Sequence, residues 1–351
     1  MRVVVLGASG NTGTSLLQAL ADEPSVDSIV GVARRKPQAQ FEKTEWTTAD
    51  VTRDDIVPML RGADVVVHLV WAIQPSRDDA ELRRINVAGS ERVLRAVAEA
   101  KAPALVYASS VGAYSPGPKD RRVDEGWPTG GIGTSFYSRH KAEVERLVDR
   151  FEQEHPDRRV VRLRPALIFK REAASGIRRL FAGPLLPSPL LRGGRLPVVP
   201  NIPGLVFQTV HSLDVGHAYR LAITGDARGA FNVAAEPVLD PSAIAEITGG
   251  RLVPVPARVA RLAAAGTWRL RLQPTPPGWL DLALGSPLMD TSRAKAELGW
   301  TPEHDAGSAL REILAGMGES AGMDTPPLAP STGGPFRLRE LLTGVGRSSG
   351  E

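Results

Sequence analysis

The sequence predicts an α/β fold in which a parallel β-sheet carries helices on both of its faces. Short apolar, β-branched runs occur at residues 2–6, 28–33, 64–70, 104–108 and 159–163. They alternate with helix-like stretches at 14–21, 53–61, 78–100 and 137–154. This alternation is typical of strand–helix–strand units, which place their strands parallel in one sheet. The glycine-rich segment after the first run supports the same fold.

That segment is Gly7-Ala8-Ser9-Gly10-Asn11-Thr12-Gly13, between the strand-like run at 2–6 and a helix-like stretch from Ser15 to Leu20. Three glycines at a spacing of three residues are a weak signal in a chain with 35 glycines. Their position makes them informative. A strand, a glycine turn and a helix form the arrangement in which backbone N–H groups and a helix N-terminus receive a pyrophosphate.

The second half of the chain predicts a smaller, discontinuous domain. Residues 166–207 are rich in Pro, Gly and Arg and break the alternation, which resumes near 205–211 and 230–234. Residues 236–316 carry helices between proline-rich linkers. We therefore expect a cofactor domain of 1–165 plus 208–235 and a substrate domain of 166–207 plus 236–316. Residues 317–351 are rich in Gly, Pro, Ser and Thr and predict a disordered tail, with an amphipathic docking element at 336–342 as the alternative.

Composition narrows the classes of protein. The 351 residues include no cysteine, which excludes disulfides and zinc–thiolate sites. The net charge of +4 reflects 43 basic and 39 acidic residues, without the concentrated basic stripe of a nucleic-acid-binding protein. No apolar run approaches the roughly 18 residues of a membrane-spanning helix, and the first apolar run has only strand length. We expect a cytoplasmic protein whose partner is a small molecule, with neither nucleic acid nor membrane as a partner and a homodimer as one option.

Tyr137 is followed four residues later by Lys141 in a helix-like stretch. At this spacing the phenol and the ammonium lie on one face of a helix, one turn apart. A tyrosine hydroxyl is a poor acid or base near neutrality because its pKa in solution is about 10. A neighbouring cation favours the phenolate and lowers that pKa. The pair is a candidate for acid–base chemistry, although the spacing also fits a surface helix with Phe136 and Tyr137 packed inward.

Further motifs follow in order, and together they resemble the extended short-chain dehydrogenase/reductases, which include nicotinamide-dependent epimerases, dehydratases and reductases. The resemblance covers roughly residues 1–305. In its first half the matching segments are the glycine turn, Asp50-Val51, Asp64 to Leu69, Asn86 to Ser90, Ala108 to Tyr114, Asp124-Glu125 and Trp127-Pro128. In its second half they are Arg164-Pro165, Val210-His211, Asp214-Val215, Phe231-Asn232-Val233, Ser292-Arg293-Ala294 and Leu298-Gly299-Trp300.

The resemblance implies a Rossmann-type cofactor domain and a catalytic set of Ser110, Tyr137 and Lys141. Tyr137 would exchange a proton with the substrate oxygen while hydride moves to or from the nicotinamide. Lys141 would hold the nicotinamide ribose and lower the pKa of Tyr137. Ser110 would orient the substrate oxygen, with Ser109 as the alternative contact. The implied cofactor-binding residues are Gly7, Ser9, Gly10, Asn11, Thr12, Gly13, Arg34, Arg35, Asp50, Val51, Leu69, Val70, Asn86, Tyr137 and Lys141.

Arg34 and Arg35 follow the strand that ends at Ala33. An acidic residue here would bind the adenosine ribose diol, whereas a guanidinium pairs with a 2′-phosphate. Arg34 stands where the NAD-specific relatives place aspartate. We therefore expect NADP as the cofactor, with NAD as the alternative and an ordinary solvated arginine pair as the simplest other interpretation.

Other polar and aromatic residues receive structural interpretations. His68 lies in an apolar run and fits a core residue better than a base. His211 and Asp214 match a structural corner of the family, and we expect no metal there because no third ligand is near. Trp127 either borders the substrate or is a packed indole. Arg258, Arg261, Trp268, Arg269 and Arg271 predict a basic amphipathic helix with a solvated face over an apolar stripe.

Departures from the family bear on the reaction. Ser110 is followed by Val111-Gly112, where dehydratase members carry an Asp-Glu pair. The chain also lacks recognisable nucleotide-sugar segments, although Arg178, Arg179, Arg192 and Arg195 remain able to bind phosphate. The region 180–207 is rich in Leu, Val and Pro, so we expect an apolar ketone or alcohol as substrate. The leading function is an oxidoreductase acting on a carbonyl or secondary alcohol. The alternatives are a nucleotide-sugar epimerase and a non-catalytic NADP-binding sensor or scaffold.

Overall fold

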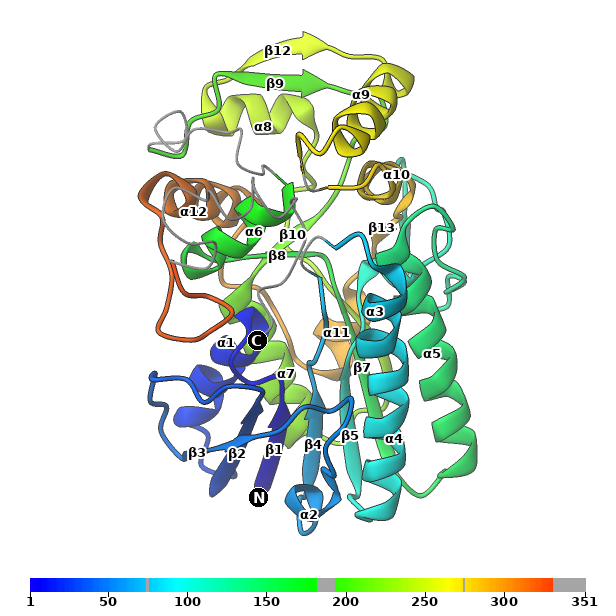
Figure 1. Ribbon diagram of the computed structural model, residues 1–351, viewed down its shortest axis with the longest axis vertical. Coiled ribbons are helices and arrows are strands. Elements are labelled where there is room, and N and C mark those ends of the chain that lie inside the picture. Colours follow the sequence, from blue (N-terminus) through cyan, green and yellow to red (C-terminus); the bar gives the residue numbers. More distant parts are fainter. Residues whose placement is uncertain (74–75, 182–192, 274, 331–351) are drawn as a thin grey trace.

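The computed structural model describes residues 1–73, 76–181, 193–273 and 275–330. Its main feature is a seven-stranded sheet in which each strand pairs parallel with its neighbours (Figure 1). The strands lie in the order β11-β7-β5-β4-β1-β2-β3. Their bounds are β1 (Arg2–Leu6), β2 (Ser28–Ala33), β3 (Thr44–Thr48), β4 (Val65–His68), β5 (Ala104–Ala108), β7 (Arg159–Pro165) and β11 (Gly229–Val233).

Helices cover both faces of this sheet. One face carries α1 (Asn11–Ala21), α7 (Ser212–Thr224) and α11 (Ser292–Glu297). The other carries α2 (Val57–Leu60), α4 (Gly89–Glu99) and α5 (Phe136–Glu154), and α3 (Asp79–Arg83) leads into α4 through a π-helical turn, η1 (Arg84–Ala88). The sequence prediction of a doubly wound, Rossmann-type α/β fold is therefore confirmed.

The first strand shows why these runs are apolar throughout rather than alternating. Val3 and Val5 pack into the core beneath α1 and α7, whereas Val4 and Leu6 pack into the core beneath α4 and α5. All four side chains are fully buried. A strand that is buried on both faces selects apolar residues at every position.

A smaller part lies beyond the carboxyl ends of the strands (Figure 1). It contains two short parallel strand pairs, β8 (Leu167–Phe169) with β10 (Thr209–His211) and β9 (Val198–Asn201) with β12 (Arg251–Pro254). Its helices are α6 (Ala174–Phe181), α8 (Pro241–Thr248), α9 (Ala257–Arg269), α10 (Gly278–Gly285) and α12 (Ala306–Glu319). A third pair, β6 (Arg122–Val123) with β13 (Leu288–Met289), and the 3-10 turns Val111–Ala113 and Arg171–Ala173 complete the elements.

Three features differ from the sequence expectation. The edge strand β3 was not expected, because none of its residues is buried. The run near 205–211 does not rejoin the main sheet, since β10 pairs with β8 instead. Ordered chain continues past residue 317, where a disordered tail was expected: α12 ends at Glu319 and Leu328 is buried against α12 and its neighbours.

The exact domain boundaries stay a prediction. The amphipathic docking element expected at 336–342 lies outside the described residues. Within the described part of the chain, no helix has both the length and the apolar character needed to cross a bilayer.

Candidate active site

The glycine turn lies at the carboxyl end of β1, where neighbouring chain approaches it closely. Gly7 has φ +87°, and a Cβ there would lie 3.0 Å from the carbonyl carbon of Leu69 and from the backbone nitrogen of Val70. A Cβ on Gly13 would lie 2.4 Å from the carbonyl oxygen of Ala8. Any side chain at Gly7 or Gly13 would therefore displace backbone. The structure brings the turn and the loop after β4 together, as expected for a topological switch point between β1 and β4.

The geometry of this turn fits a diphosphate. Gly10 is the N-cap of α1, and no side chain caps the first turn of the helix. A Cβ on Gly10 would meet only the carbonyl oxygen of Gly7, at 3.5 Å, so the approach to the helix N-terminus is open. The side-chain oxygen Oδ1 of Asn11 is buried without a hydrogen-bond partner among the described residues. Free N–H groups at a helix N-terminus are the usual receptor for a pyrophosphate.

Arg34 and Arg35 are both exposed at the end of β2, and Arg34 lies near Asp50. Asp50 accepts hydrogen bonds on Oδ1 from the backbone nitrogen and the hydroxyl of Thr52, at 2.9 and 2.7 Å. Burial raises the pKa of Asp50, but these hydrogen bonds and the charge of Arg34 outweigh it, so its pKa is lowered. The structure therefore places a carboxylate and exposed guanidinium groups at the edge expected to hold the adenosine.

Asn86 acts on the loop after β4. It is fully buried in η1, where its Oδ1 accepts from the Ala72 nitrogen at 2.7 Å and its Nδ2 donates to the Ala72 oxygen at 3.0 Å. Both ends of the amide are thus used to fix the loop that contains Leu69 and Val70. This hydrogen bonding gives Asn86 a positioning role in the structure, while direct contact with a cofactor stays a prediction.

The helix α5 carries the acid–base candidates on one face. Ser135 caps its N-terminus by accepting from the Ser138 nitrogen, and Tyr137, Lys141 and Glu145 follow at intervals of four residues. Ser110, at the end of β5, is hydrogen-bonded to Tyr137 through its side chain, and its Oγ also accepts from the Gly112 nitrogen at 3.0 Å. The structure therefore brings Ser110, Tyr137 and Lys141 together.

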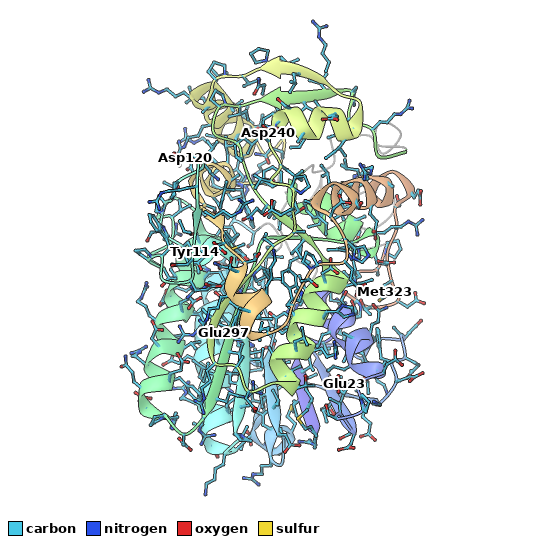
Figure 2. The ribbon with its side chains drawn as sticks, turned by 180° about the vertical axis from the view of Figure 1, so that it is seen from behind. Glu23, Tyr114, Asp120, Asp240, Glu297 and Met323 are labelled. Carbon is cyan, nitrogen blue, oxygen red and sulfur yellow. The ribbon has the colours of Figure 1, made fainter. Side chains whose placement is uncertain are left out.

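Ser109 points to a different partner. Its hydroxyl donates to Glu145, which accepts from the guanidinium of Arg164 on both carboxylate oxygens, at 2.8 and 3.0 Å. Burial raises the pKa of Glu145, but the hydrogen bonds and charge of Arg164 outweigh it and hold the pKa at about 2. Arg164 also donates to the hydroxyl of Tyr114, which Figure 2 labels near the middle of the molecule. Ser109 belongs to this buried network, and Ser110 is the serine beside Tyr137.

Lys141 does not lower the pKa of Tyr137 as expected. Its Nζ donates to the Ala108 oxygen at 2.7 Å and lies 3.6 Å from the centroid of a Trp71 ring, but 5.9 Å from the centroid of the Tyr137 ring. Burial raises the pKa of Tyr137 to about 12, and the hydrogen bond with Ser110 offsets only part of this. Burial also lowers the pKa of Lys141 to about 7, against the opposing charge of Glu145.

Aromatic side chains that no sequence pattern indicated form walls around Tyr137. Trp71 lies edge-on to the Tyr137 ring at 5.9 Å between centroids, and Trp279 of α10 lies at 5.1 Å with its plane tilted by 34°. An apolar cluster continues from there, comprising Ile73, Ile132, Phe136, Leu180 and Leu282. Trp71 and Trp279 are far apart in the chain and belong to no periodic pattern, so only the fold places them together.

A buried lysine behind the glycine turn was also missed. Lys170, just after β8, donates from Nζ to Thr14 Oγ1 at 2.7 Å, to Ser15 Oγ at 3.2 Å and to the Asn11 oxygen at 3.3 Å. Burial lowers its pKa to about 8, and the carboxylates of Glu172 and Glu312 oppose that change. Lys170 fixes the first turn of α1 to the smaller part and adds positive charge near the diphosphate site.

Two histidines singled out from the sequence, His68 and His211, have packing and capping roles in the structure. His68 is buried in β4, where its Nε2 lies 2.9 Å from the Ser90 hydroxyl, and burial lowers its pKa to about 3. His211 caps α7 through Nδ1, which accepts from the Leu213 nitrogen at 3.3 Å.

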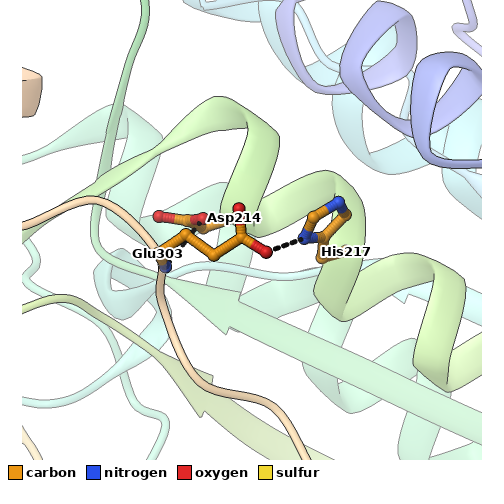
Figure 3. A group of neighbouring side chains, drawn as sticks. All are labelled: Asp214, His217 and Glu303. Carbon is orange, nitrogen blue, oxygen red and sulfur yellow. Dashed lines mark hydrogen bonds and ion pairs between the residues drawn. The ribbon is translucent and has the colours of Figure 1, made fainter.

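Asp214, His217 and Glu303 gather closely enough to resemble a metal site (Figure 3). However, the Asp214 carboxylate is already engaged by the backbone nitrogens of Glu303 and His304, at 3.1 and 3.0 Å. Through these hydrogen bonds, Asp214 joins α7 to the chain before α12. The expectation that no metal binds here stays a prediction.

Of the other residues singled out from the sequence, only some lie near Tyr137. Trp127 is a packed indole, whose Nε1 donates to the Ser115 oxygen at 3.3 Å. In the expected apolar pocket of 180–207, Leu180 does join the cluster near Tyr137, but Val198 is exposed and residues 182–192, with Arg192, lie outside the described residues. A cavity of about 690 Å³ bordered by 193–195, α8 and α12 is separate from the residues around Tyr137.

Comparison with known proteins identifies the class. The sheet order and the glycine turn define a Rossmann-type α/β fold in which Ser110, Tyr137 and Lys141 are grouped, and a family model for the NAD dependent epimerase/dehydratase family matches residues 3–179. The chain therefore belongs to that family, and its resemblance to the extended short-chain dehydrogenase/reductases is confirmed.

Three relatives illustrate the range of the family. The uncharacterized protein Rv2047c of Mycobacterium tuberculosis is 27% identical over 316 residues, which cover 89% of this chain and 30% of the relative. This chain thus spans less than a third of the length of that relative. A 4-hydroxy-2-methyl-3-oxo-4-farnesyl-3,4-dihydroquinoline-1-oxide ketoreductase of Stigmatella aurantiaca is 33% identical over 151 residues, 42% of this chain and 45% of the relative. The structure of MoeE5 in complex with UDP-glucuronic acid and NAD aligns with a TM-score of 0.67 at 22% identity, covering 91% of this chain and 100% of MoeE5, and supports the fold.

Proposed function

We propose that the protein is an NAD(P)-dependent oxidoreductase that reduces an apolar ketone or oxidises the corresponding secondary alcohol. The observation that carries this proposal is the grouping of Ser110, Tyr137 and Lys141 beneath the indoles of Trp71 and Trp279. A nicotinamide cofactor supplies or accepts the hydride in this family. The chain's own residues bind and orient the substrate oxygen and manage the proton.

Each residue has a role that follows from its contacts. The hydroxyls of Ser110 and Tyr137 are hydrogen-bonded, so both are placed to donate to one carbonyl oxygen. Tyr137 donates its proton to the substrate oxygen while that oxygen gains negative charge. The phenol of Tyr137 has a pKa of about 12 and is therefore protonated at neutral pH. Lys141 lies one turn further along α5, where its role is to hold the nicotinamide ribose.

The walls of the site support an apolar substrate. Trp71 and Trp279 lie against the Tyr137 ring, and Phe136 packs against Trp279. Burying apolar substrate there is favourable by about 25 cal/mol per Å², whereas sugar hydroxyls would lack partners. The quinoline oxide ketoreductase relative, whose name includes a farnesyl group and a 3-oxo group, supports the same class of substrate.

The preferred cofactor that we propose is NADP, since exposed Arg34 and Arg35 follow β2 and suit a 2′-phosphate. MoeE5 and other structural neighbours are complexes with NAD, so NAD is the alternative. Cytoplasmic location and a homodimer are further expectations, which cell fractionation and analytical ultracentrifugation would check.

A turnover comparison tests the reaction. Consumption of NADPH is followed spectroscopically with a panel of aliphatic and aromatic ketones and with nucleoside-diphosphate sugars. We expect ketone turnover by the unmodified protein and a loss of about 10²–10⁴-fold in Tyr137→Phe, which removes the proton donor but keeps the ring. Full turnover by Tyr137→Phe would place the chemistry elsewhere. Epimerisation of a nucleotide sugar consumes no cofactor, so it is followed separately by chromatography of the sugar products. Efficient epimerisation would instead establish the epimerase alternative.

A further inference from the structure

The exposed large apolar side chains of the described residues all gather at one end of the molecule. They are Val198, Val253, Val259, Leu262, Leu270 and Leu272. They lie on β9, on β12, on α9 and directly after α9, which Figure 1 places together at the far end from the N-terminus. We call this surface the apolar end. Single exposed apolar residues are ordinary on a protein surface, but several of them on neighbouring elements mark a candidate interaction site.

The helix α9 presents its apolar face to solvent. Val259, Leu262, Ala263, Gly266 and Leu270 fall on one face at spacings of three, four, seven and eleven residues. None of the residues of α9 is buried, and Leu262 and Leu270 are 70% and 72% exposed. A surface helix normally turns this face toward the core. The arginines of this segment are exposed as expected, whereas Leu262 and Leu270, which were expected to pack beneath them, are exposed as well.

Polar contacts hold α9 in this orientation. Arg261 pairs with the Asp281 carboxylate of α10, with distances of 2.7 and 3.0 Å from its Nε and Nη2. Arg77, in the loop that follows Trp71, donates to the Trp268 oxygen and lies over the Trp268 ring at 4.5 Å. The helix is thus fastened through charged groups, and its apolar face is left outward.

The charge of this segment selects the partner. Residues 251–273 contain five arginines (Arg251, Arg258, Arg261, Arg269 and Arg271) and no Asp or Glu. All five are exposed, and Arg258 and Arg269 flank Leu262 on the outward face of α9. A helix with an outward apolar face bordered by arginines is typical of a segment that lies in the interface of an anionic bilayer.

We propose that the apolar end docks onto the surface of an anionic lipid bilayer, with α9 lying in the plane of the interface. A second copy of the chain fits less well, because a two-fold contact through this end would place the same arginines opposite one another without acidic partners in the segment. The proposal revises the expectation of no membrane partner, since it requires surface contact and no spanning helix. It also places the bilayer beside Trp268 and α10, next to the aromatic walls of the active site.

Vesicle flotation with the full chain tests the proposal without cofactor or substrate. We expect the protein to float with phosphatidylcholine vesicles that contain phosphatidylglycerol, less at high salt, and not with phosphatidylcholine alone. Leu262→Asn combined with Leu270→Asn should reduce the partition coefficient by roughly tenfold or more. Arg258→Gln combined with Arg269→Gln should reduce it about fivefold per arginine. Arg146→Gln combined with Arg150→Gln, exposed on α5, is the matched control and should change nothing.

Three results would overturn the proposal. The first is an absence of flotation with anionic vesicles at low salt, and the second is equal flotation of all the variants. The third is a concentration-dependent dimer, seen by analytical ultracentrifugation, that Leu262→Asn combined with Leu270→Asn abolishes, because it would assign the apolar end to a second copy of the chain. Circular dichroism of each variant confirms that the fold is retained. Since the readout involves no turnover, failure here leaves the proposed reaction intact.

Discussion

At the scale of single residues, the proposed reaction depends on how Tyr137 is held. Its ring contacts the rings of Trp71 and Trp279, its hydroxyl is hydrogen-bonded to Ser110, and Gly112 lies beside the ring. A Cβ on Gly112 would lie 2.7 Å from Cε1 of Tyr137. The glycine that stands where dehydratases carry an acidic residue thus also makes room for the Tyr137 ring.

Gly112→Ala should therefore impair turnover more than stability. The methyl group would push the Tyr137 ring away from Ser110, and a displacement of about 1 Å at a reacting group can cost about 10²-fold in rate. Gly133→Ala is the matched control, because a Cβ there meets nothing within 4 Å. Steady-state kinetics and thermal melts on both variants decide the point. Equal activity of the two variants would show that Gly112 does not position Tyr137.

At the scale of elements, the carboxyl end of β2 decides cofactor choice. Arg34→Asp replaces a cation that suits a 2′-phosphate with a carboxylate that suits a ribose diol. We expect NADPH to bind more tightly than NADH to the unmodified protein, and the variant to narrow or invert that ratio. Calorimetric titration with both cofactors measures it, with Arg150→Asp on α5 as a control for net charge. An NADH preference in the unmodified protein would contradict the assignment.

The elements also show what the sequence could predict. The strands β1, β2 and β5 match their expected bounds, because both faces of each are covered over most of their length and select apolar residues there. The edge strand β3 escaped notice because its Thr and Glu residues give no apolar signal. The pairing of β10 with β8 could not be foreseen either, since a three-residue strand carries no information about its partner.

The residues of the candidate site also differ in how far the sequence predicts their proximity. Tyr137 and Lys141 share a helix, so their spacing alone predicts their proximity. Trp71, Trp279 and Lys170 reach the site from separate elements, and no local pattern indicates that they meet. The orientation of α9 was likewise unpredictable, because periodicity gives two faces of a helix but not which one the fold covers.

At the scale of the whole molecule, buried lysines couple stability to pH. Burial lowers the pKa of Lys141 to about 7 and those of Lys119 and Lys170 to about 8. In the unfolded chain a lysine titrates near 10.4, so between about pH 7 and 10 the unfolded chain binds more protons than the folded one. The contribution of these groups to stability therefore increases as the pH rises through this window.

Lys170→Met tests one part of that coupling. The variant should melt at a higher temperature than the unmodified protein at pH 7, where the buried ammonium is charged, and the difference should shrink as the pH rises past about 8. It should also bind NADPH more weakly, because a positive charge near the diphosphate site is lost. Melting curves across pH and calorimetry provide the readouts, with the exposed Lys36→Met as control. A melting difference that is independent of pH would show that burial does not lower the pKa of Lys170.

We propose that Tyr137 and its neighbours direct hydride from a reduced nicotinamide to an apolar carbonyl carbon. Incubation of the protein with an apolar ketone and NADPH that carries deuterium at the transferable position, followed by mass spectrometry of the alcohol, tests this step. We expect one deuterium in each alcohol molecule formed by the unmodified protein and almost no product with Tyr137→Phe. An alcohol formed without deuterium, or one formed equally well by Tyr137→Phe, would show that hydride transfer does not take place in this way.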